Sequence, residues 1–234
     1  NTPRFPKQLT LGAIQDNRLL FDMGKEIARQ CRRIGVNVNL APVVDVNNNP
    51  NNPVIYDRSF GEDKYNVAQK GIAYMQGMEN NGIMACAKHF PGHGDTNADS
   101  HYTLPVINHN LAHLLDIELY PFKELIQSGI GGVMTAHLSV PALDNTTVKP
   151  GATQTTPTTL SKKVITNLLK NDLHFEGLVF TDALNMKGVS SFFAPGMVDV
   201  KALMAGNDIL LFSENVGKAI EEIKNAIARN EITQ

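Results

Sequence analysis

Residues 83–96 read Ile-Met-Ala-Cys-Ala-Lys-His-Phe-Pro-Gly-His-Gly-Asp-Thr. The first part, 83–90, is a short and mostly apolar run that follows Gly82 and carries Lys88 and His89 near its end. A run of this length and composition predicts a strand that is buried on both faces, as parallel strands are. The pattern therefore indicates a parallel sheet with polar side chains at the carboxyl end of one of its strands.

The same kind of signal recurs along the chain and alternates with helical periodicity. Apolar residues at helical spacing, followed by Gly35 and Gly82, indicate where two of the helices end. We predict strands at 36–46, 83–90, 132–137, 177–182 and 208–212. We predict helices at 19–34, 63–81, 121–128, 161–173, 198–205 and 216–228. Strands alternating with helices indicate an α/β fold, either an open doubly wound sheet or a closed barrel.

The placement of polar residues favours the barrel. No glycine-rich phosphate-binding turn follows any of the strands, which argues against a nucleotide-binding sheet. Polar residues instead fall at the carboxyl ends of the strands, where a barrel enzyme has its active site. These residues are Asp45, Lys88, His89, His137 and Asp182. We therefore predict a (β/α)8 TIM-barrel-type catalytic domain.

Residues 1–234 are expected to form a single, partial domain of this type. Five predicted strands cannot close a barrel of eight, and a whole one needs roughly 250 residues. We infer that the first strands are missing at the N-terminus, and leave open a further missing strand at the C-terminus. Further domains in a longer protein are also left open.

Composition and charge narrow the classes of partner. The 21 Lys and Arg residues nearly balance the 23 Asp and Glu residues and are scattered, so we expect no nucleic acid and no anionic membrane as partner. The sequence contains no run of about eighteen apolar residues, which is the length that would predict a membrane span. The sequence also lacks a signal-peptide pattern in this stretch. Cys31 and Cys86 are interpreted as separate structural thiols, which leaves the redox compartment open.

The densest group of reactive side chains, at 88–101, allows a metal site or acid/base chemistry. Its ligand-type residues are His89, His93, Asp95, Asp99 and His101. Pro91 and Gly92 separate the first two histidines and prevent the helical spacing that would put both imidazoles on one face. We therefore expect no metal and no cofactor, and keep a metal-dependent hydrolase as an alternative.

Acid/base chemistry needs a partner for the histidine and a second reactive group. Asp99 lies two residues before His101, and a carboxylate there can fix the imidazole tautomer and support its protonated form. Asp182 ends an apolar strand, a position that packing explains poorly. A carboxylate plus one acid/base group is the minimum for retaining glycoside hydrolysis, although both groups are usually carboxylates.

Four blocks of the sequence, in order, resemble family 3 glycoside hydrolases. Residues 88–96, with Asp99 and His101 behind them, are similar to the branch of β-N-acetylglucosaminidases, in which an Asp-x-His pair replaces the usual carboxylate acid. The other blocks are Leu-Ala-Pro-Val-Val-Asp-Val at 40–46, Asp-Arg-Ser-Phe-Gly-Glu-Asp at 57–63 and Phe-Thr-Asp-Ala-Leu at 180–184. Together they span most of the chain.

The resemblance implies roles for six residues. Asp182 would be the nucleophile, His101 the acid/base and Asp99 its orienting partner. Lys88 and His89 would bind sugar hydroxyls, and Arg58 the sugar or its acetamido group, for which its fork of donors is suited. In the family, an Asp and an Arg upstream also hold the sugar, and their positions would fall before Asn1.

Some of these residues also have structural interpretations. Arg58 could instead pair with Glu62 or Asp63, and His93 is expected to be a hydrogen-bonded loop residue. Asp45 is expected to support the site from a loop, without taking part in the reaction.

The implied activity is that of a retaining exo-β-N-acetylhexosaminidase that removes β-linked N-acetylglucosamine. Peptidoglycan fragments are the expected substrate, and chitin-derived or glycan substrates are left open. Two alternatives stay open: a phosphorylase, since a neutral His would repel phosphate less than a carboxylate would, and a truncated module that binds sugar without turnover. The compartment is left open between bacterial cytoplasm and the space outside it.

Overall fold

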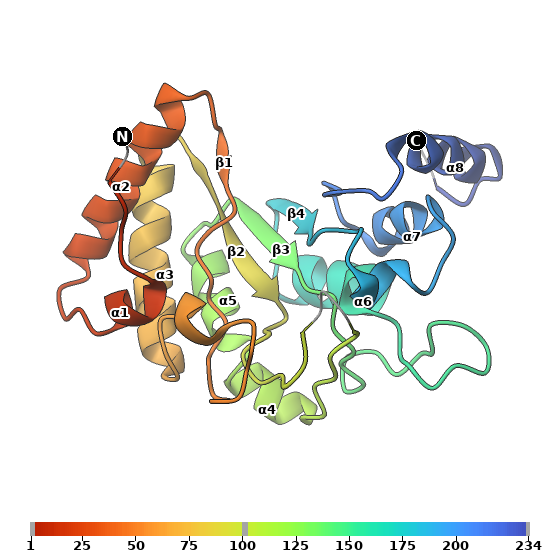
Figure 1. Ribbon diagram of the computed structural model, residues 1–234, viewed down its shortest axis with the longest axis horizontal. Coiled ribbons are helices and arrows are strands. Elements are labelled where there is room, and N and C mark those ends of the chain that lie inside the picture. Colours follow the sequence, from red (N-terminus) through yellow and green to blue (C-terminus); the bar gives the residue numbers. More distant parts are fainter. Residues whose placement is uncertain (1–2, 100–102, 233–234) are drawn as a thin grey trace. The chain divides into compact units, whose positions relative to one another are not determined.

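The structure is a computed structural model, and it describes residues 3–99 and 103–232. The chain forms two compact units (Figure 1). The first unit comprises Asn1–Asn97 and Asn110–Met134, and the second comprises Ala98–His109 and Thr135–Gln234. Each unit is described by itself below, and the assignment of residues 1–234 to one domain stays a prediction.

A parallel sheet forms the centre of the first unit. It contains β1 (Val38–Asn39), β2 (Met84–Phe90) and, up to Met134, β3 (Gly132–Thr135), in the order β1-β2-β3. β1 pairs with β2 in parallel, with Val38 opposite Met84. β2 is buried along nearly its whole length, as its apolar run predicts, and burial raises the pKa of the Cys86 thiol to about 12.

The strand predicted at 36–46 is wrong in its extent. Only Val38–Asn39 is regular strand, with one further parallel bridge between Val43 and Lys88. The Ala41 N–H donates to the Asn39 carbonyl in a tight turn, and Pro42 has no N–H to donate. Hydrogen bonds to β2 nevertheless continue, because the Ala41 and Pro42 carbonyls accept from the Cys86 and Lys88 N–H groups at 2.8 and 3.1 Å. Beyond them, the Val44 N–H donates to the Lys88 carbonyl at 2.8 Å. This path of the backbone places Asp45 beside the end of β2.

Two long helices of the first unit pack on each other, and one of them, α3 (Lys64–Glu79), packs on β2. α2 (Arg18–Arg33) and α3 lie side by side in Figure 1, and α3 starts where the Asp63 side chain accepts a hydrogen bond from the Tyr65 N–H. They approach closely at two glycines, because a Cβ on Gly77 would overlap the Phe21 carbonyl of α2. The remaining helical segments of this unit are α1 (Gln8–Gly12), η1 (Tyr56–Arg58), α4 (Leu111–Asp116) and α5 (Tyr120–Gln127).

The second unit is built around β4 (Leu178–Thr181). The Asp182 N–H, just beyond β4, donates to the carbonyl of Thr135, the last residue of β3, at 3.0 Å. The strand predicted at 208–212 is reduced to a single parallel bridge between Phe180 and Ile209. It stops there because the Leu211 N–H donates to the Thr181 hydroxyl instead of a carbonyl, and Phe212 has a φ of 50°.

Helices of the second unit pack on one another. Buried residues of α7 (Met197–Ala205) join Leu160, Leu184 and Val189 in one apolar cluster, and α8 (Val216–Ala228) packs on α7. α8 begins where the Asn215 side chain accepts a hydrogen bond from the Lys218 N–H. The other helical segments are η2 (Thr158–Leu160), the π-helix η3 (Lys163–Asp172) and α6 (Lys187–Ser190).

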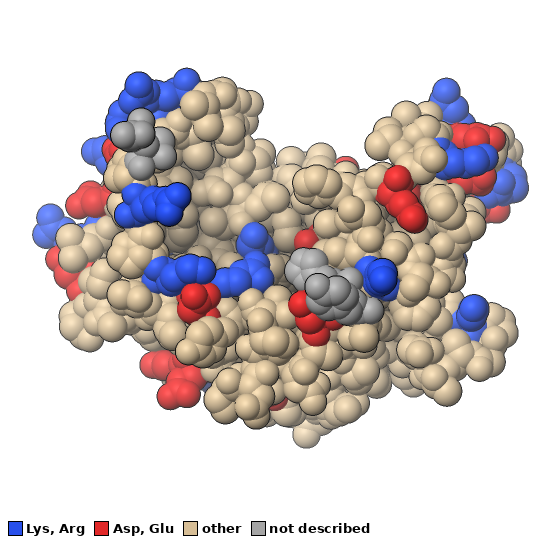
Figure 2. All heavy atoms as spheres, in the orientation of Figure 1, with Lys and Arg blue, Asp and Glu red and all other residues tan. Residues whose placement is uncertain are grey.

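Charged side chains of both signs are distributed over the surface. On the face drawn in Figure 2, Lys and Arg side chains are interspersed with Asp and Glu and separated by uncharged residues. Within residues 3–99 and 103–232, no helix combines the length and the apolar character needed to cross a bilayer.

Candidate active site

A buried carboxylate organises the end of β2 in the first unit. Asp45 is fully buried, and its side chain accepts three hydrogen bonds. Oδ1 accepts from the backbone N–H of His89 at 3.1 Å and of His93 at 2.7 Å, and Oδ2 contacts Nδ1 of the His89 ring at 2.7 Å. The Ser59 hydroxyl donates to the Asp45 carbonyl at 2.6 Å. One carboxylate thus joins the end of β2 to the loop that follows it.

These contacts also set the charge of Asp45. Burial raises the pKa of its carboxyl, but the contacts with His89 and His93 outweigh burial, so the pKa lies below the ordinary value of 3.8. The carboxylate is therefore ionised throughout the neutral range, and a buried ionised carboxylate requires such partners.

Two of the predicted sugar-binding residues lie in contact. Nη2 of Arg58, at the end of η1, is 3.3 Å from Nε2 of His89, and Nη1 donates to the Val54 carbonyl at 3.2 Å. The contacts of Arg58 are thus with His89 and Val54 rather than with Glu62 or Asp63. Lys88 precedes His89 in β2 and is half-buried. Both ring nitrogens of His89 face protein groups, an arrangement that does not suit a metal ligand.

The glycines of the 91–96 loop let it pack closely against its neighbours. A Cβ on Gly92, whose φ is 128°, would lie 2.7 Å from Cβ of Glu118. A Cβ on Gly94 would overlap the Val46 carbonyl, so any side chain here would push the loop away from the segment that carries Asp45. His93 is buried, and its Nδ1 lies 2.8 Å from the Thr96 hydroxyl, as expected of a hydrogen-bonded loop residue.

Asn52 fastens the same loop and was not singled out in the sequence. Its Nδ2 donates to the His93 carbonyl at 2.8 Å and to the Gly94 carbonyl at 2.9 Å. Its Oδ1 accepts from the backbone N–H groups of Val54 and Ile55. Because Asn52 lies in an Asn- and Pro-rich segment, only its burial separates it from the neighbouring asparagines.

The second unit contains the predicted nucleophile. Asp182 directly follows β4 and is half-buried, and its Oδ1 accepts a hydrogen bond from the Ala183 N–H at 2.8 Å. Nearby, His137 is fully buried, with Nδ1 2.8 Å from the Thr159 hydroxyl and Nε2 3.0 Å from the Ala183 carbonyl. His137 therefore braces the backbone that follows Asp182.

The predicted acid/base pair is described only in part. The Asp99 carbonyl accepts a hydrogen bond from the Thr103 N–H at 3.1 Å, and its half-buried side chain has further interactions. His101 lies outside the described residues. The roles of Asp99, His101 and Asp182 therefore remain predictions, as do those of Arg58, Lys88 and His89.

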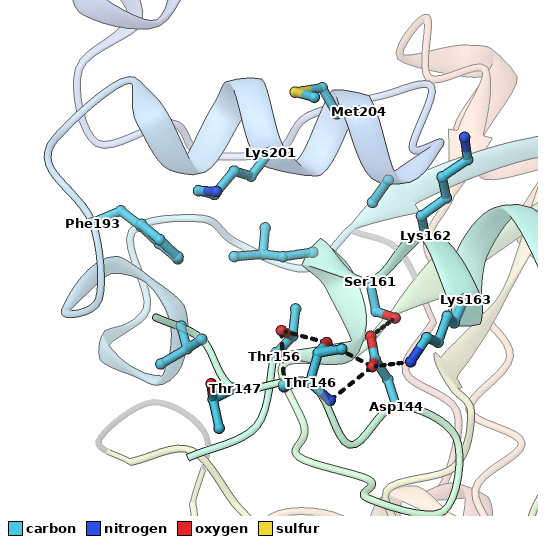
Figure 3. A pocket seen from close by; sticks show the side chains of 13 residues that line it. Asp144, Thr146, Thr147, Thr156, Ser161, Lys162, Lys163, Phe193, Lys201 and Met204 are labelled. Atoms are coloured by element: carbon cyan, nitrogen blue, oxygen red, sulfur yellow. Dashed lines mark hydrogen bonds and ion pairs between the residues drawn. The ribbon is translucent and has the colours of Figure 1, made fainter. Parts of the chain in front are cut away.

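The second unit also has a pocket of about 430 Å³ that the sequence did not indicate (Figure 3). On one wall, the buried Asp144 carboxylate accepts hydrogen bonds from Ser161 at 2.6 Å, from the Thr146 hydroxyl at 2.7 Å and from Lys163 at 3.0 Å. Burial raises the pKa of Asp144, but the hydrogen bonds from Ser161 and Thr146 outweigh burial and lower it. Asp144 therefore has a structural role, because its carboxylate already accepts hydrogen bonds from three side chains of the protein.

The family of the chain follows from comparison with known proteins. The model of the glycosyl hydrolase family 3 N terminal domain matches residues 1–234. The chain belongs to this family. Its fold is accordingly the α/β, TIM-barrel-type fold predicted from the sequence, and the described parallel strands β1, β2 and β3 are part of it.

Two relatives of the chain are named for related hexosaminidase activities. The chain is 42% identical over 210 residues to beta-hexosaminidase A of Pseudoalteromonas piscicida, covering 88% of the chain and 34% of that protein. It is similar to the structure of a family 3 beta-N-acetylglucosaminidase from Paenibacillus sp. at 38% identity and a TM-score of 0.90, covering 97% of the chain and 42% of that structure. The chain thus spans less than half the length of these two relatives.

One structural neighbour with the same fold is named for a different activity, phosphorolysis. The beta-glucoside phosphorylase BglX has a TM-score of 0.92 and 25% identity to this chain, covering all of the chain and 42% of that structure. Membership of family 3 therefore leaves hydrolysis and phosphorolysis to be separated by experiment.

Proposed function

We propose that the chain carries the catalytic residues of a retaining exo-β-N-acetylhexosaminidase that releases terminal β-linked N-acetylglucosamine, with peptidoglycan fragments as its substrate. The observation that carries this proposal is the position of Asp182, a half-buried carboxylate at the carboxyl end of a parallel strand. The identity to beta-hexosaminidase A and the likeness to a beta-N-acetylglucosaminidase support the choice of sugar.

The proposed reaction proceeds by double displacement. The Asp182 carboxylate attacks the anomeric carbon while the glycosidic C–O bond breaks, and the protonated His101, supported by Asp99, gives its proton to the leaving oxygen. Water then attacks the anomeric carbon of the glycosyl ester, His101 takes the proton, and the Asp182 carboxylate leaves. General acid/base help of this kind supplies about 10²–10⁴-fold, and covalent capture lowers the barrier further.

Arg58, Lys88 and His89 are proposed to hold the sugar. Arg58 and Lys88 have only donors, which suits the acetamido carbonyl and the hydroxyl oxygens of N-acetylglucosamine. The hydrogen bonds that fix His89 and Arg58 before the sugar arrives reduce the entropy lost on binding.

Paired aryl glycosides test the substrate class. An aryl N-acetyl-β-glucosaminide should be hydrolysed and the matching aryl β-glucoside should not, because the proposed site depends on the acetamido group. The assay is run on this chain and on a chain extended at its N-terminus, where the further sugar-binding residues of the family are expected. Preferential cleavage of the glucoside would overturn the proposal.

The same assay separates the two alternatives. A phosphorylase, which the likeness to BglX keeps open, would release N-acetylglucosamine 1-phosphate and depend on added phosphate. The proposed hydrolase should release free N-acetylglucosamine at an equal rate without phosphate. Binding of N-acetylglucosamine without turnover by both chains would indicate a sugar-binding module instead.

A further inference from the structure

The hydrogen bonds around His89 determine which of its nitrogens carries the proton. Nδ1 lies 2.7 Å from Oδ2 of Asp45. An ionised carboxylate has acceptors and no donor, so Nδ1 must be the donor in this contact. The same carboxylate holds the His89 backbone N–H through Oδ1, so the ring and its own main chain are fixed by one group.

The other ring nitrogen supports the same assignment independently. Nε2 lies 3.3 Å from Nη2 of Arg58. A guanidinium has five donors and no acceptor, so Nε2 must supply a lone pair. Both contacts are satisfied by a single tautomer, with the proton on Nδ1 and the lone pair on Nε2 facing Arg58.

We propose that Asp45 is a positioning residue that sets the tautomer of His89 and, through it, the orientation of the Arg58 guanidinium. Carboxylates that hold the second nitrogen of a histidine act in this way in other sites. With Nη2 on His89 and Nη1 on Val54, the guanidinium is fixed at both ends. Its remaining N–H groups are then presented as donors for an acceptor on the substrate, which the proposed function identifies as the acetamido carbonyl.

The substitution Asp45→Asn replaces a hydrogen-bond acceptor by a donor opposite Nδ1 of His89. The amide oxygen can still accept from the backbone N–H groups of His89 and His93, but its NH₂ group faces Nδ1. Nδ1 must then accept, so the proton moves to Nε2 and points at the Arg58 guanidinium. Two donors cannot bond each other, and Arg58 loses its partner.

Nitrogen NMR of the histidine rings reads this tautomer directly. In ¹⁵N-labelled protein, the two-bond ¹H–¹⁵N spectrum should show His89 with a protonated Nδ1 and an unprotonated Nε2, and the signals are assigned by their loss in His89→Gln. Asp45→Asn should exchange the two nitrogens. Arg58→Ala should leave them unchanged, because Asp45 is the residue that sets the tautomer.

Kinetics give the second measurement. Asp45→Asn should raise KM for the aryl N-acetyl-β-glucosaminide about 10- to 100-fold, with a smaller effect on kcat. Asp144→Asn is the matched control, a buried aspartate with hydrogen bonds from Ser161, Thr146 and Lys163 but none to His89 (Figure 3). Asp144→Asn should leave the His89 spectrum and KM unchanged. The melting temperatures of both variants are measured as well, so that a loss of folded protein is not taken for a change in the site.

The two proposals fail in different ways. A wild-type His89 with its proton on Nε2, or on both nitrogens, overturns the role of Asp45 even where Asp45→Asn does not fold. An unchanged spectrum and KM in Asp45→Asn also overturns it. Absence of hydrolysis together with the expected spectrum would count against the proposed function alone.

Discussion

At the scale of single residues, Asn52 shows how one side chain can fix a loop of the candidate site. Its amide joins the carbonyls of His93 and Gly94 to the N–H groups of Val54 and Ile55. Asn52→Ala leaves these groups without their partner in a buried place, which typically costs about 1–3 kcal/mol. We expect the free energy of unfolding, measured by urea titration, to fall by about this amount.

The neighbouring Asn51 provides the control for this prediction. Its side chain is exposed, so Asn51→Ala should change the free energy of unfolding by no more than about 0.5 kcal/mol. Equal losses in the two variants would mean that Asn52 does not fasten the loop.

Sequence patterns indicate candidate reactive residues more readily than the residues that hold them in place. Lys88, His89 and Asp182 stand out because polar groups at the ends of apolar strands are poorly explained by packing. Asn52 does not stand out, because its segment contains several asparagines and the sequence alone does not indicate which one is buried. The tautomer of His89 likewise depends on Asp45, 44 positions away in the sequence, and so on the folded chain.

At the scale of elements, the close approach of α2 and α3 depends on Gly77. A Cβ there would overlap the Phe21 carbonyl and lie 3.0 Å from the Gly24 Cα. Gly77→Ala should therefore separate the helices and lower the free energy of unfolding by about 1–3 kcal/mol, a cost typical of overpacking. Thermal and urea unfolding of the variant measure this loss.

Gly217, in α8, is the matched control. A Cβ there would meet only the Asn215 side chain, at an ordinary 3.5 Å. Because alanine favours helix over glycine, Gly217→Ala should raise the free energy of unfolding by up to about 1 kcal/mol. A stabilising Gly77→Ala would show that the two helices do not meet as described.

The long elements were predictable and the irregular ones were not. Helices such as α2 and α3 follow from apolar periodicity over several turns, and β2 from a continuous apolar run. The strand predicted at 36–46 is not regular throughout because the Ala41 N–H turns back to the Asn39 carbonyl and Pro42 has no N–H to donate. The strand predicted at 208–212 ends where the Leu211 N–H donates to the Thr181 hydroxyl. The short helices α1, α4 and α6 were not predicted, since four to six residues show too little periodicity.

At the scale of the whole molecule, stability should depend on buried carboxylates. Asp45 and Asp144 both have a folded-state pKa below the ordinary 3.8. Each therefore stabilises the fold fully above the unfolded pKa, and this contribution is lost as pH falls through the folded pKa, because the unfolded chain binds protons first. The free energy of unfolding should decline as the pH is lowered from about 4.

Asp144→Asn isolates one of these contributions. At neutral pH this variant should be less stable than the wild type by about 1–3 kcal/mol, because its hydrogen bonds from Thr146, Ser161 and Lys163 no longer reach a charge. The difference, from urea titrations at pH 7, 5, 4 and 3, should shrink below about pH 4. A difference that grows toward low pH contradicts the lowered pKa of Asp144.

The fold class and the family were predictable because four separate motifs occur in the expected order. The candidate site could be proposed from the sequence only as a set of residue types, since the sequence does not give distances between side chains from different strands.

The most direct test of the proposed function is covalent capture at Asp182. A 5-fluorinated N-acetylglucosaminyl fluoride slows release of the glycosyl ester, because fluorine destabilises the positive charge that develops on the ring. After digestion, mass spectrometry should find the glycosyl mass on the peptide that holds Asp182, and Asp182→Asn should carry none. A turned-over reagent with no labelled peptide, or a label on another carboxylate, would contradict the account.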